Sequence, residues 1–365
     1  MSWMAKKLGT DRLLFTITIA LMMFGLVMIY SASAVLAMEK YGNPFYYAIR
    51  QAMWCVISLC AMMVMMNIHY RTWNQRTLVF TMLAIAAILL VAVLFMSPVA
   101  NVRRWFRAGP ASLQPAELAK FPLVVFLAYH LSRRQGQIDT LWPGVLPALL
   151  VCGQFAILVV LEPDLGTAFM YVGVTTALLF LAGMPWRYFA ASAAVALPVF
   201  YLLIMNVDYR RERLLVFLNP EANAQDGGFQ ILQSLIALGT GGVQGVGLAN
   251  SIQKLFYLPE PHTDFIYAIV GEELGLVGCV AVVLAFVFFL WRGLRIAWKA
   301  PDPFAQFLAA GITTLIVLQA LINISVVIGL MPTKGIPLPF ISSGGSSLLV
   351  SMMGVGVLLN ISQHV

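Results

Sequence analysis

Asp264 is the last polar residue before a long apolar run of the sequence. A carboxylate at such a membrane boundary can act as a general base on a hydroxyl group of a lipid-anchored substrate. A helix dipole would also favour an acidic residue there, but it would lower the pKa and weaken the base, whereas partial burial would raise the pKa. His262 is a rival base and Glu260 a rival carboxylate, so these residues alone leave the choice open.

Two groups of basic residues could bind an anion near this carboxylate. They are Arg103, Arg104 and Arg107 in one polar segment, and Arg210, Arg211 and Arg213 in another. The topology derived below places both groups on the outer side of a membrane, against the usual bias of Lys and Arg towards cytoplasmic loops. An anionic ligand at the outer leaflet would explain them. The alternative is that a long loop is translocated whatever its charge, which suits the second segment better than the short first one.

Glu117 and Lys120 lie three residues apart, and therefore on one face of a helix. Charged side chains within a membrane helix are costly, and they mark a cavity, a ligand or a partner. The pair could bind a substrate, or it could neutralise itself and only fix the packing of the helix. The sequence favours neither interpretation.

Lys334 lies in the segment Gly329–Leu349, which is rich in Pro, Gly and Ser. Irregular backbone at a membrane edge has to be buried in protein or line a cavity. The N–H groups of this segment, together with Lys334, could receive phosphate oxygens. Ser342–Ser347 are expected to form a plain turn.

Other acidic residues have simpler explanations. Asp164 follows the helix breaker Pro163, and it is predicted to cap the next helix, whereas Glu162 could neutralise an arginine. Two further carboxylates lie deeper in the apolar run after Asp264, and either could pair with a lysine: these are Glu272 and Glu273, with Lys120 and Lys334 as candidate partners.

Several sharper signatures are missing from the sequence. The Gly-rich run at 239–247 fits neither a dinucleotide-binding fingerprint nor a phosphate-binding loop of nucleotide hydrolases. The four histidines are scattered, and the four cysteines lie in apolar runs without metal-ligand spacing. We therefore predict no metal site and no cofactor from these patterns, and the sequence leaves a requirement for a divalent metal open.

The composition is that of a protein embedded in a lipid bilayer. Of its 365 residues, 61% are hydrophobic and 10% are charged, whereas an ordinary soluble domain has about 25% charged residues. The net charge of +7 comes from short basic clusters between apolar runs, which favours contacts with anionic lipid over nucleic acid. The first apolar run is too long for a signal peptide and is expected to be a retained helix.

Ten apolar runs are predicted to form membrane-spanning helices of an all-α protein, since about 20 apolar residues cross a bilayer. They are Leu13–Ala37, Tyr47–Met66, Leu78–Met96, Leu118–Leu131, Leu141–Leu161, Leu165–Ala182, Tyr188–Met205, Phe265–Leu290, Phe304–Leu330 and Ser346–Ile361.

Basic residues in short connections set the orientation, with both termini in the cytoplasm. Half of the 22 basic residues would then be cytoplasmic: Lys6, Lys7, Arg12, Arg71, Arg76, Arg133, Arg134, Arg187, Arg292, Arg295 and Lys299. The chain is predicted to be a single membrane domain, 1–365, with one large extracytoplasmic loop, 206–264, between the seventh and eighth spans. This loop keeps apolar stretches and is expected to fold back onto the membrane surface. No internal repeat supports a transporter.

Five segments together resemble the SEDS family, the shape, elongation, division and sporulation proteins. They read RRWFRAGPASLQPAELAK, EPDLGTA, RLLVFLNPEA, the stretch from GFQILQSLIALGTGGVQGVG to EPHTDFIYAIVGEELGL, and GLMPTKGIPLPFISSGGSSLL. The motifs PEPHTDF and MPTKGIPLPF resemble those of the division branch of the family more than those of its elongation branch.

The resemblance implies a ten-helix enzyme of the bacterial cytoplasmic membrane that polymerises lipid II into peptidoglycan glycan strands, at the division septum. It implies a class B penicillin-binding protein and other divisome proteins as partners. By the same resemblance, Asp264 is the base that deprotonates the acceptor sugar, and cations stabilise the departing polyprenyl diphosphate. The predicted substrate-binding residues are Arg103, Arg104, Glu117, Lys120, Arg213 and Lys334.

The sequence departs from the family pattern at Asn101 and Val102, and at Ala116 and Ser343, which affects local loop geometry. Two other functions are open. A lipid II flippase would need a polar path to the cytoplasmic leaflet, whereas the unexplained charges lie on the outer half. A non-catalytic scaffold would only activate a penicillin-binding partner.

Overall fold

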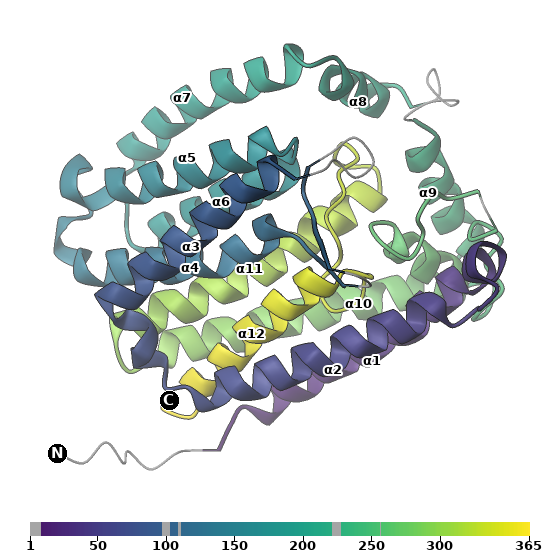
Figure 1. Ribbon diagram of the computed structural model, residues 1–365, viewed down its shortest axis with the longest axis horizontal. Helices are drawn as coiled ribbons and strands as arrows, with labels where there is room; N and C mark the ends of the chain where they lie inside the picture. The colour runs from purple at the N-terminus through teal and green to yellow at the C-terminus, as the bar shows by residue number, and fades with distance from the viewer. Residues whose placement is uncertain (1–8, 97–102, 109–110, 221–227, 256) are drawn as a thin grey trace.

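The computed structural model describes residues 9–96, 103–108, 111–220, 228–255 and 257–365. The chain is helical almost throughout, with its long helices running side by side in one bundle (Figure 1). The long helices are α1 (Arg12–Tyr41), α2 (Tyr46–Asn67), α3 (Arg76–Leu94), α4 (Pro115–Arg133), α5 (Leu146–Leu161), α6 (Leu165–Leu181), α7 (Trp186–Met205), α10 (Ile266–Lys299), α11 (Pro303–Val327) and α12 (Gly345–Ser362).

Short elements connect these helices. They are the 3-10 helices η1 (Tyr70–Asn74) and η2 (Gln135–Gln137), the π-helical turn η3 (Leu141–Val145), the antiparallel strands β1 (Phe106–Ala108) and β2 (Ala111–Leu113), and the helices α8 (Asp208–Leu218) and α9 (Gly228–Gly241). In the register of the two strands, Phe106 lies opposite Leu113.

The predicted all-α membrane architecture is confirmed. Among the described residues, eight helices are long and apolar enough to cross a membrane, and α6 is a shorter apolar helix. Each of the ten predicted apolar runs coincides with a helix. Ten crossings of the bilayer stay a prediction. The helix α4 carries buried charges and is not among the eight helices that are apolar enough to cross.

One boundary differs clearly from the prediction. The helix α10 continues nine residues beyond the predicted end at Leu290, as far as Lys299. The charged residues after Leu290 end the apolar run, but the helix continues because Arg and Lys are good helix formers. This last part of α10 projects its basic side chains beyond the apolar stretch.

The central helices and the outer helices differ in burial. Most residues of α11 and α12 are buried against α4, α10 and α2, whereas no residue of α7 is buried. The helix α7 lies along the edge of the bundle and continues into α8 (Figure 1).

The loop 206–264 is partly helical, because its two apolar stretches form α8 and α9. The helix α9 packs on the core, where the hydroxyl group of Ser234 donates to the main-chain oxygen of Val327 at 2.7 Å. This contact is with protein, whereas the expected contact of the loop with the membrane surface stays a prediction.

Residues 242–247 of the Gly-rich run, which follow the end of α9, form a strap across a break in α10. Gly275 interrupts that helix with φ 66°, and the opened main chain bonds to the strap. A side chain at Gly245 would collide with the main chain of Glu273, so glycine is required at this close approach. The four bonds, at 2.9–3.2 Å, join Leu276 to Gly242, Val277 to Val243, Val246 to Glu272 and Gly247 to Glu273.

Candidate active site

Asp264 lies at the end of the large loop, two residues before α10, and its side chain is half-buried. Its main-chain oxygen accepts a hydrogen bond from Nδ2 of Asn323 on α11 at 2.8 Å, and the same amide donates to the oxygen of Ile336 at 2.7 Å. A Cβ atom at Gly335 would lie 2.9 Å from Oδ2 of Asp264. The loop after α11 thus passes directly against the carboxylate.

The serines of that loop hold the segment before Asp264. The hydroxyl group of Ser342 donates to the oxygen of Thr263 at 2.6 Å and accepts from the amide of Leu338 at 2.8 Å. The amide of Ser343 donates to the oxygen of His262 at 3.0 Å. The predicted plain turn at Ser342–Ser347 describes only part of this segment, because Ser342 and Ser343 also join the loop to the segment of Asp264 and α12 already begins at Gly345.

The electrostatic surroundings of Asp264 favour a base. Burial raises the pKa of its carboxyl group from 3.8 to about 7, helped by the charges of Glu260 and Asp164, while Arg213 and Arg104 lower it. The helix α10 begins without a side-chain cap, so Asp264 does not serve as its cap. A pKa near neutrality is the value that suits general base catalysis.

The two rival groups suit the role less well. His262 is buried and packs against the ring of Tyr47 at 4.3 Å. Burial lowers the pKa of His262 to about 4, aided by the charge of Lys40, which makes it a weak base at neutral pH. The side chain of Glu260 is 58% exposed.

Three of the predicted cations surround the site. Arg104 donates from Nε to the oxygen of Glu162 at 2.8 Å and also bonds to the oxygen of Pro163. Arg213 on α8 donates to the oxygen of Thr333 at 3.3 Å, next to Lys334. The ammonium group of Lys334 lies 5.4 and 5.8 Å from two ring centroids, and burial lowers its pKa. Those rings belong to Phe169 of α6 and Phe200 of α7.

The other outer arginines are engaged elsewhere. Arg103 is exposed and donates to the oxygen of Leu94 at 3.0 Å. Arg210 is buried and donates to main-chain oxygens of α7 and α5, and Arg211 pairs with Asp208 at 3.3 Å. The side chain of Arg107, and both Asn101 and Val102, fall outside the part of the chain that the structure describes.

Glu117 and Lys120 are both buried and bond to each other, Nζ to Oε1, at 2.6 Å. Lys120 also donates to Oε1 of Gln319 on α11 at 2.8 Å, and that amide donates to Pro337 and Ser347 at 2.9 Å. With exposures of 4% and 2%, the pair has no free surface for a ligand. The packing interpretation, which the sequence left open, describes this arrangement.

The joint between α5 and α6 carries two different carboxyl groups. Asp164 caps α6 as predicted, accepting from the amide of Thr167 at 3.1 Å, and it also accepts from Gln114 at 3.1 Å. Glu162 is fully buried, and neither of its carboxyl oxygens has a hydrogen-bond partner among the described residues. Burial raises the pKa of Glu162 to about 8. Arg104 hydrogen-bonds to the main chain of Glu162, and its charge lowers the pKa of that carboxyl group in part, but the described residues show no ion pair between the two side chains.

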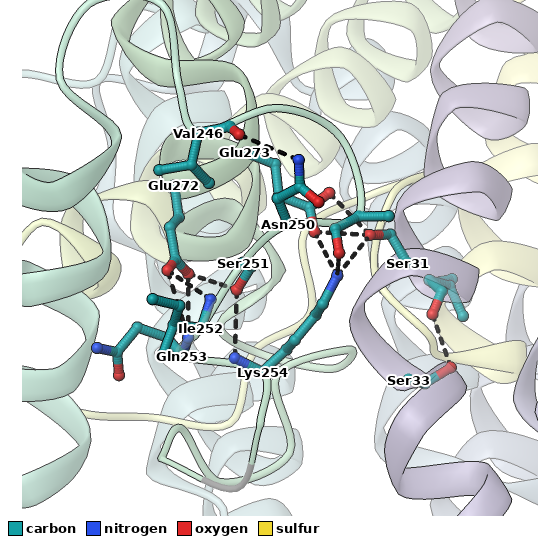
Figure 2. A network of polar contacts seen from close by, with 12 residues as sticks. Ser31, Ser33, Val246, Asn250, Ser251, Ile252, Gln253, Lys254, Glu272 and Glu273 are labelled. Atoms are coloured by element: carbon teal, nitrogen blue, oxygen red, sulfur yellow. Dashed lines mark hydrogen bonds and ion pairs between the residues drawn. The ribbon is translucent and has the colours of Figure 1, made fainter.

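A second buried ion pair joins the loop after the strap to α10, and a serine of α1 binds the same carboxylate (Figure 2). Lys254 contacts Glu273 at 2.8 Å, and the hydroxyl group of Ser31 donates to both oxygens of that carboxylate at 2.7 and 2.8 Å. The carboxylate of Glu272 accepts from the hydroxyl of Ser251 and from the amides that follow it. The suggested partners Lys120 and Lys334 were therefore wrong, and Lys254 is the partner of Glu273.

Sequence reasoning missed Asn323 and Gly335, which contact Asp264, and Lys254, which pairs with Glu273 in α10. Only the long-range contacts reveal them, although the Gly and Pro content of 329–340 was a signal that the backbone there packs closely. Across the described part of the chain, no three His, Cys, Asp or Glu side chains are grouped to hold a metal ion. The absence of a cofactor stays a prediction.

The fold and the site define a class: a multi-pass helical membrane protein whose polar site, with one half-buried carboxylate among cations, lies at the end of the bundle away from its termini. Residues 11–365 match the family model of FtsW, RodA and SpoVE, described as "Cell cycle protein". The chain belongs to this family, and the predicted SEDS resemblance is confirmed.

Relatives and solved structures agree with this membership. The chain is 43% identical to a probable peptidoglycan glycosyltransferase FtsW of Geobacter metallireducens, covering 96% of this chain and 94% of the relative. It is 42% identical to stage V sporulation protein E of Bacillus subtilis, covering 98% of each.

Among solved structures, a chain described under "structural coordination of polymerization and crosslinking by a peptidoglycan synthase complex" superposes with a TM-score of 0.80 at 27% identity, covering 99% of each chain. The rod shape determining protein RodA of Thermus thermophilus superposes with a TM-score of 0.72 at 25% identity, covering 99% of this chain and 97% of RodA.

Proposed function

We propose that this chain is a peptidoglycan glycosyltransferase of cell division, which polymerises lipid II into glycan strands with Asp264 as general base. The enzyme class is supported by the relatives named as probable peptidoglycan glycosyltransferases, at 43% identity over nearly the whole chain. The single observation that carries the mechanism is the half-buried Asp264, whose raised pKa lies near neutrality and whose neighbours include Arg104 and Arg213.

In the proposed reaction, Asp264 accepts the proton of a sugar hydroxyl group on the acceptor. The resulting oxygen attacks the anomeric carbon of the donor sugar, and the bond between that carbon and the polyprenyl diphosphate breaks. Negative charge grows on the departing diphosphate, where fixed cations stabilise the transition state. Arg104, Arg213 and Lys334 supply these cations.

The remaining predicted contacts take different places in this proposal. Arg103 is exposed near the same end and stays a predicted contact for substrate phosphates. Glu117 and Lys120 act through packing, since they are buried beneath the site.

The proposed partner is a class B penicillin-binding protein, which crosslinks the strands that this enzyme makes. The likeness to a chain of a peptidoglycan synthase complex supports such a partner. We place the enzyme in the bacterial cytoplasmic membrane at the division septum, together with other divisome proteins. FtsW relatives and the apolar helices support this location.

The decisive experiment replaces Asp264 by Asn and measures the conversion of lipid II into glycan polymer by the purified complex with its partner. Loss of a general base is expected to slow polymerisation by about 10²–10⁴-fold. Glu260→Gln tests the rival carboxylate: its side chain is 58% exposed and its charge only helps to raise the pKa of Asp264, so this variant should keep most of its activity.

The same variant separates the alternatives. If the Asp264→Asn complex still polymerises lipid II at the original rate, the catalytic assignment fails. If the chain were only a scaffold, the complex would polymerise lipid II only when the partner itself is a polymerase. The rate would then not depend on the residue at position 264. A flippase would move lipid II between the leaflets of vesicles, and that transport would depend on Asp264 although polymerisation did not.

A further inference from the structure

The end of the bundle that carries both termini holds a cavity of about 280 Å³, far from Asp264 along the helices. The start of α1, the end of α10 and the end of α12 form its walls. This volume lies just below the range of about 300–1,000 Å³ for small-molecule sites, so it suits a headgroup rather than a whole lipid. Four basic residues line it: Arg12, Arg292, Arg295 and Lys299.

One of these four cations is already neutralised and fixes the walls. Arg292 donates to Oδ2 of Asp11 from Nη2 at 2.5 Å and from Nε at 3.1 Å. The other oxygen of Asp11 caps α1 by accepting from Leu14 at 3.0 Å, and its amide donates to Ser362 of α12 at 3.1 Å. Asp11 is therefore fully used, and three helices are locked around the cavity.

The other three cations form no ion pair with a carboxylate in the part of the chain that the structure describes. Arg12, Arg295 and Lys299 are exposed, and no acidic side chain in the described residues forms an ion pair with them. Arg292, Arg295 and Lys299 stand at intervals of three and four residues, which places them on one face of α10. Like charges gathered on one face repel each other, and a bound anion would remove that repulsion.

Aromatic residues place this cavity at the level of lipid headgroups. Trp291 is 52% exposed and Trp298 is 87% exposed, as is typical of side chains at a membrane–water interface. The guanidinium groups of Arg292 and Arg295 lie 5.2 and 5.8 Å from the ring of Trp291. A ligand from the adjoining leaflet could enter the cavity beside these rings.

We propose that this cavity binds the phosphodiester headgroup of an anionic phospholipid, held by Arg12, Arg295 and Lys299. Basic pockets between helices on the cytoplasmic side of membrane proteins have the chemistry for such headgroups. The site is independent of the proposed polymerase reaction, since it lies at the opposite end of the bundle. The simpler explanation is that these cations only set the orientation of the helices.

The test measures lipid binding to the purified full-length chain by native mass spectrometry in detergent, with phosphatidylglycerol, phosphatidylcholine or inorganic phosphate added. The variant Arg12→Gln/Arg295→Gln/Lys299→Gln removes the three cations that form no ion pair with a carboxylate among the described residues. The matched control, Arg76→Gln/Arg133→Gln/Arg187→Gln, removes three basic residues from the starts of α3 and α7 and the end of α4. Both variants change exposed residues, and unaltered melting curves establish that they fold.

The proposal predicts preferential binding of phosphatidylglycerol over phosphatidylcholine. At about fivefold for each basic residue, the triple variant should lose affinity on the order of 100-fold, while the control keeps it. Equal losses in both triple variants would mean that net charge alone attracts the lipid, which overturns the proposal. Occupancy by inorganic phosphate without any preference among lipids would assign the cavity to a soluble anion and overturn the lipid assignment.

Discussion

Two regions of the bundle meet at the site and are held in very different ways. In the centre, Gln319 of α11 bonds to Lys120, Pro337 and Ser347, so one side chain joins α4, α12 and the loop beside Asp264. At the edge, α7 buries no residue and α8 is largely exposed. The carboxylate of Asp264 is therefore held by a rigid support, whereas Arg213 lies on a sparsely packed helix. Substitutions in the centre should therefore affect folding, and those at the edge should affect only activity.

The largest effect is expected from Lys120→Met in the centre. This change leaves the buried carboxylate of Glu117 without its ion-pair partner, which should lower the free energy of unfolding by about 3–5 kcal/mol. The measurement is a melting curve of the purified protein in detergent. The control is Glu117→Leu/Lys120→Met, which removes both charges and should recover most of the loss. A Lys120→Met protein as stable as the original would show that the centre is less rigid than we argue.

A smaller effect is expected where the rigid support touches the base. Gly335→Ala adds a methyl group 2.9 Å from Oδ2 of Asp264, which must displace the carboxylate. A misplacement of about 1 Å can cost about 100-fold in rate, so polymerisation should fall by up to that amount while the melting curve stays unchanged. Gly136→Ala, where nothing lies within 4 Å of the added atom, is the control. Full activity of Gly335→Ala would show that this loop does not position the carboxylate of Asp264 for the reaction.

At the edge, Arg213→Gln should slow polymerisation by about tenfold or more, because a hydrogen bond to a charged group contributes about 1.5–3 kcal/mol. The melting temperature should not change, since Arg213 is exposed. The matched control is Arg211→Gln on the same helix, whose exposed ion pair with Asp208 should contribute little. Equal activities of the two variants would show that Arg213 does not bind the diphosphate.

The sequence predicted the spans, because each needs a long apolar run, and it predicted the cap at Asp164, because capping depends on neighbouring residues. It also singled out Asp264, Arg104 and Lys334, which the structure brings to one end of the bundle. These features depend on local composition or on sequence motifs that are specific to the family.

What the sequence could not reveal depends on contacts between distant segments. Hydropathy does not distinguish α7, which buries nothing, from α11, which is mostly buried, because both are equally apolar. The ion pair of Lys254 with Glu273 forms where the loop that follows the Gly-rich strap lies against α10, and no local pattern in the sequence indicates this contact. The unpaired, buried Glu162 likewise follows from packing and not from its neighbours in the sequence.

The central claim is that the deprotonated carboxylate of Asp264 accepts a proton in the reaction. Its pKa is raised from 3.8 to about 7, so the group is mostly protonated in mildly acidic solution and becomes a base only as the pH rises. The most direct test is the rate of lipid II polymerisation by the complex as a function of pH, at substrate concentrations well below saturation, where the rate reports the pKa of the free enzyme. We predict that the rate rises by about tenfold per pH unit below a midpoint near 7 and then levels off. A rate that stays flat across this range, or the same rise in the Asp264→Asn variant, would contradict the account.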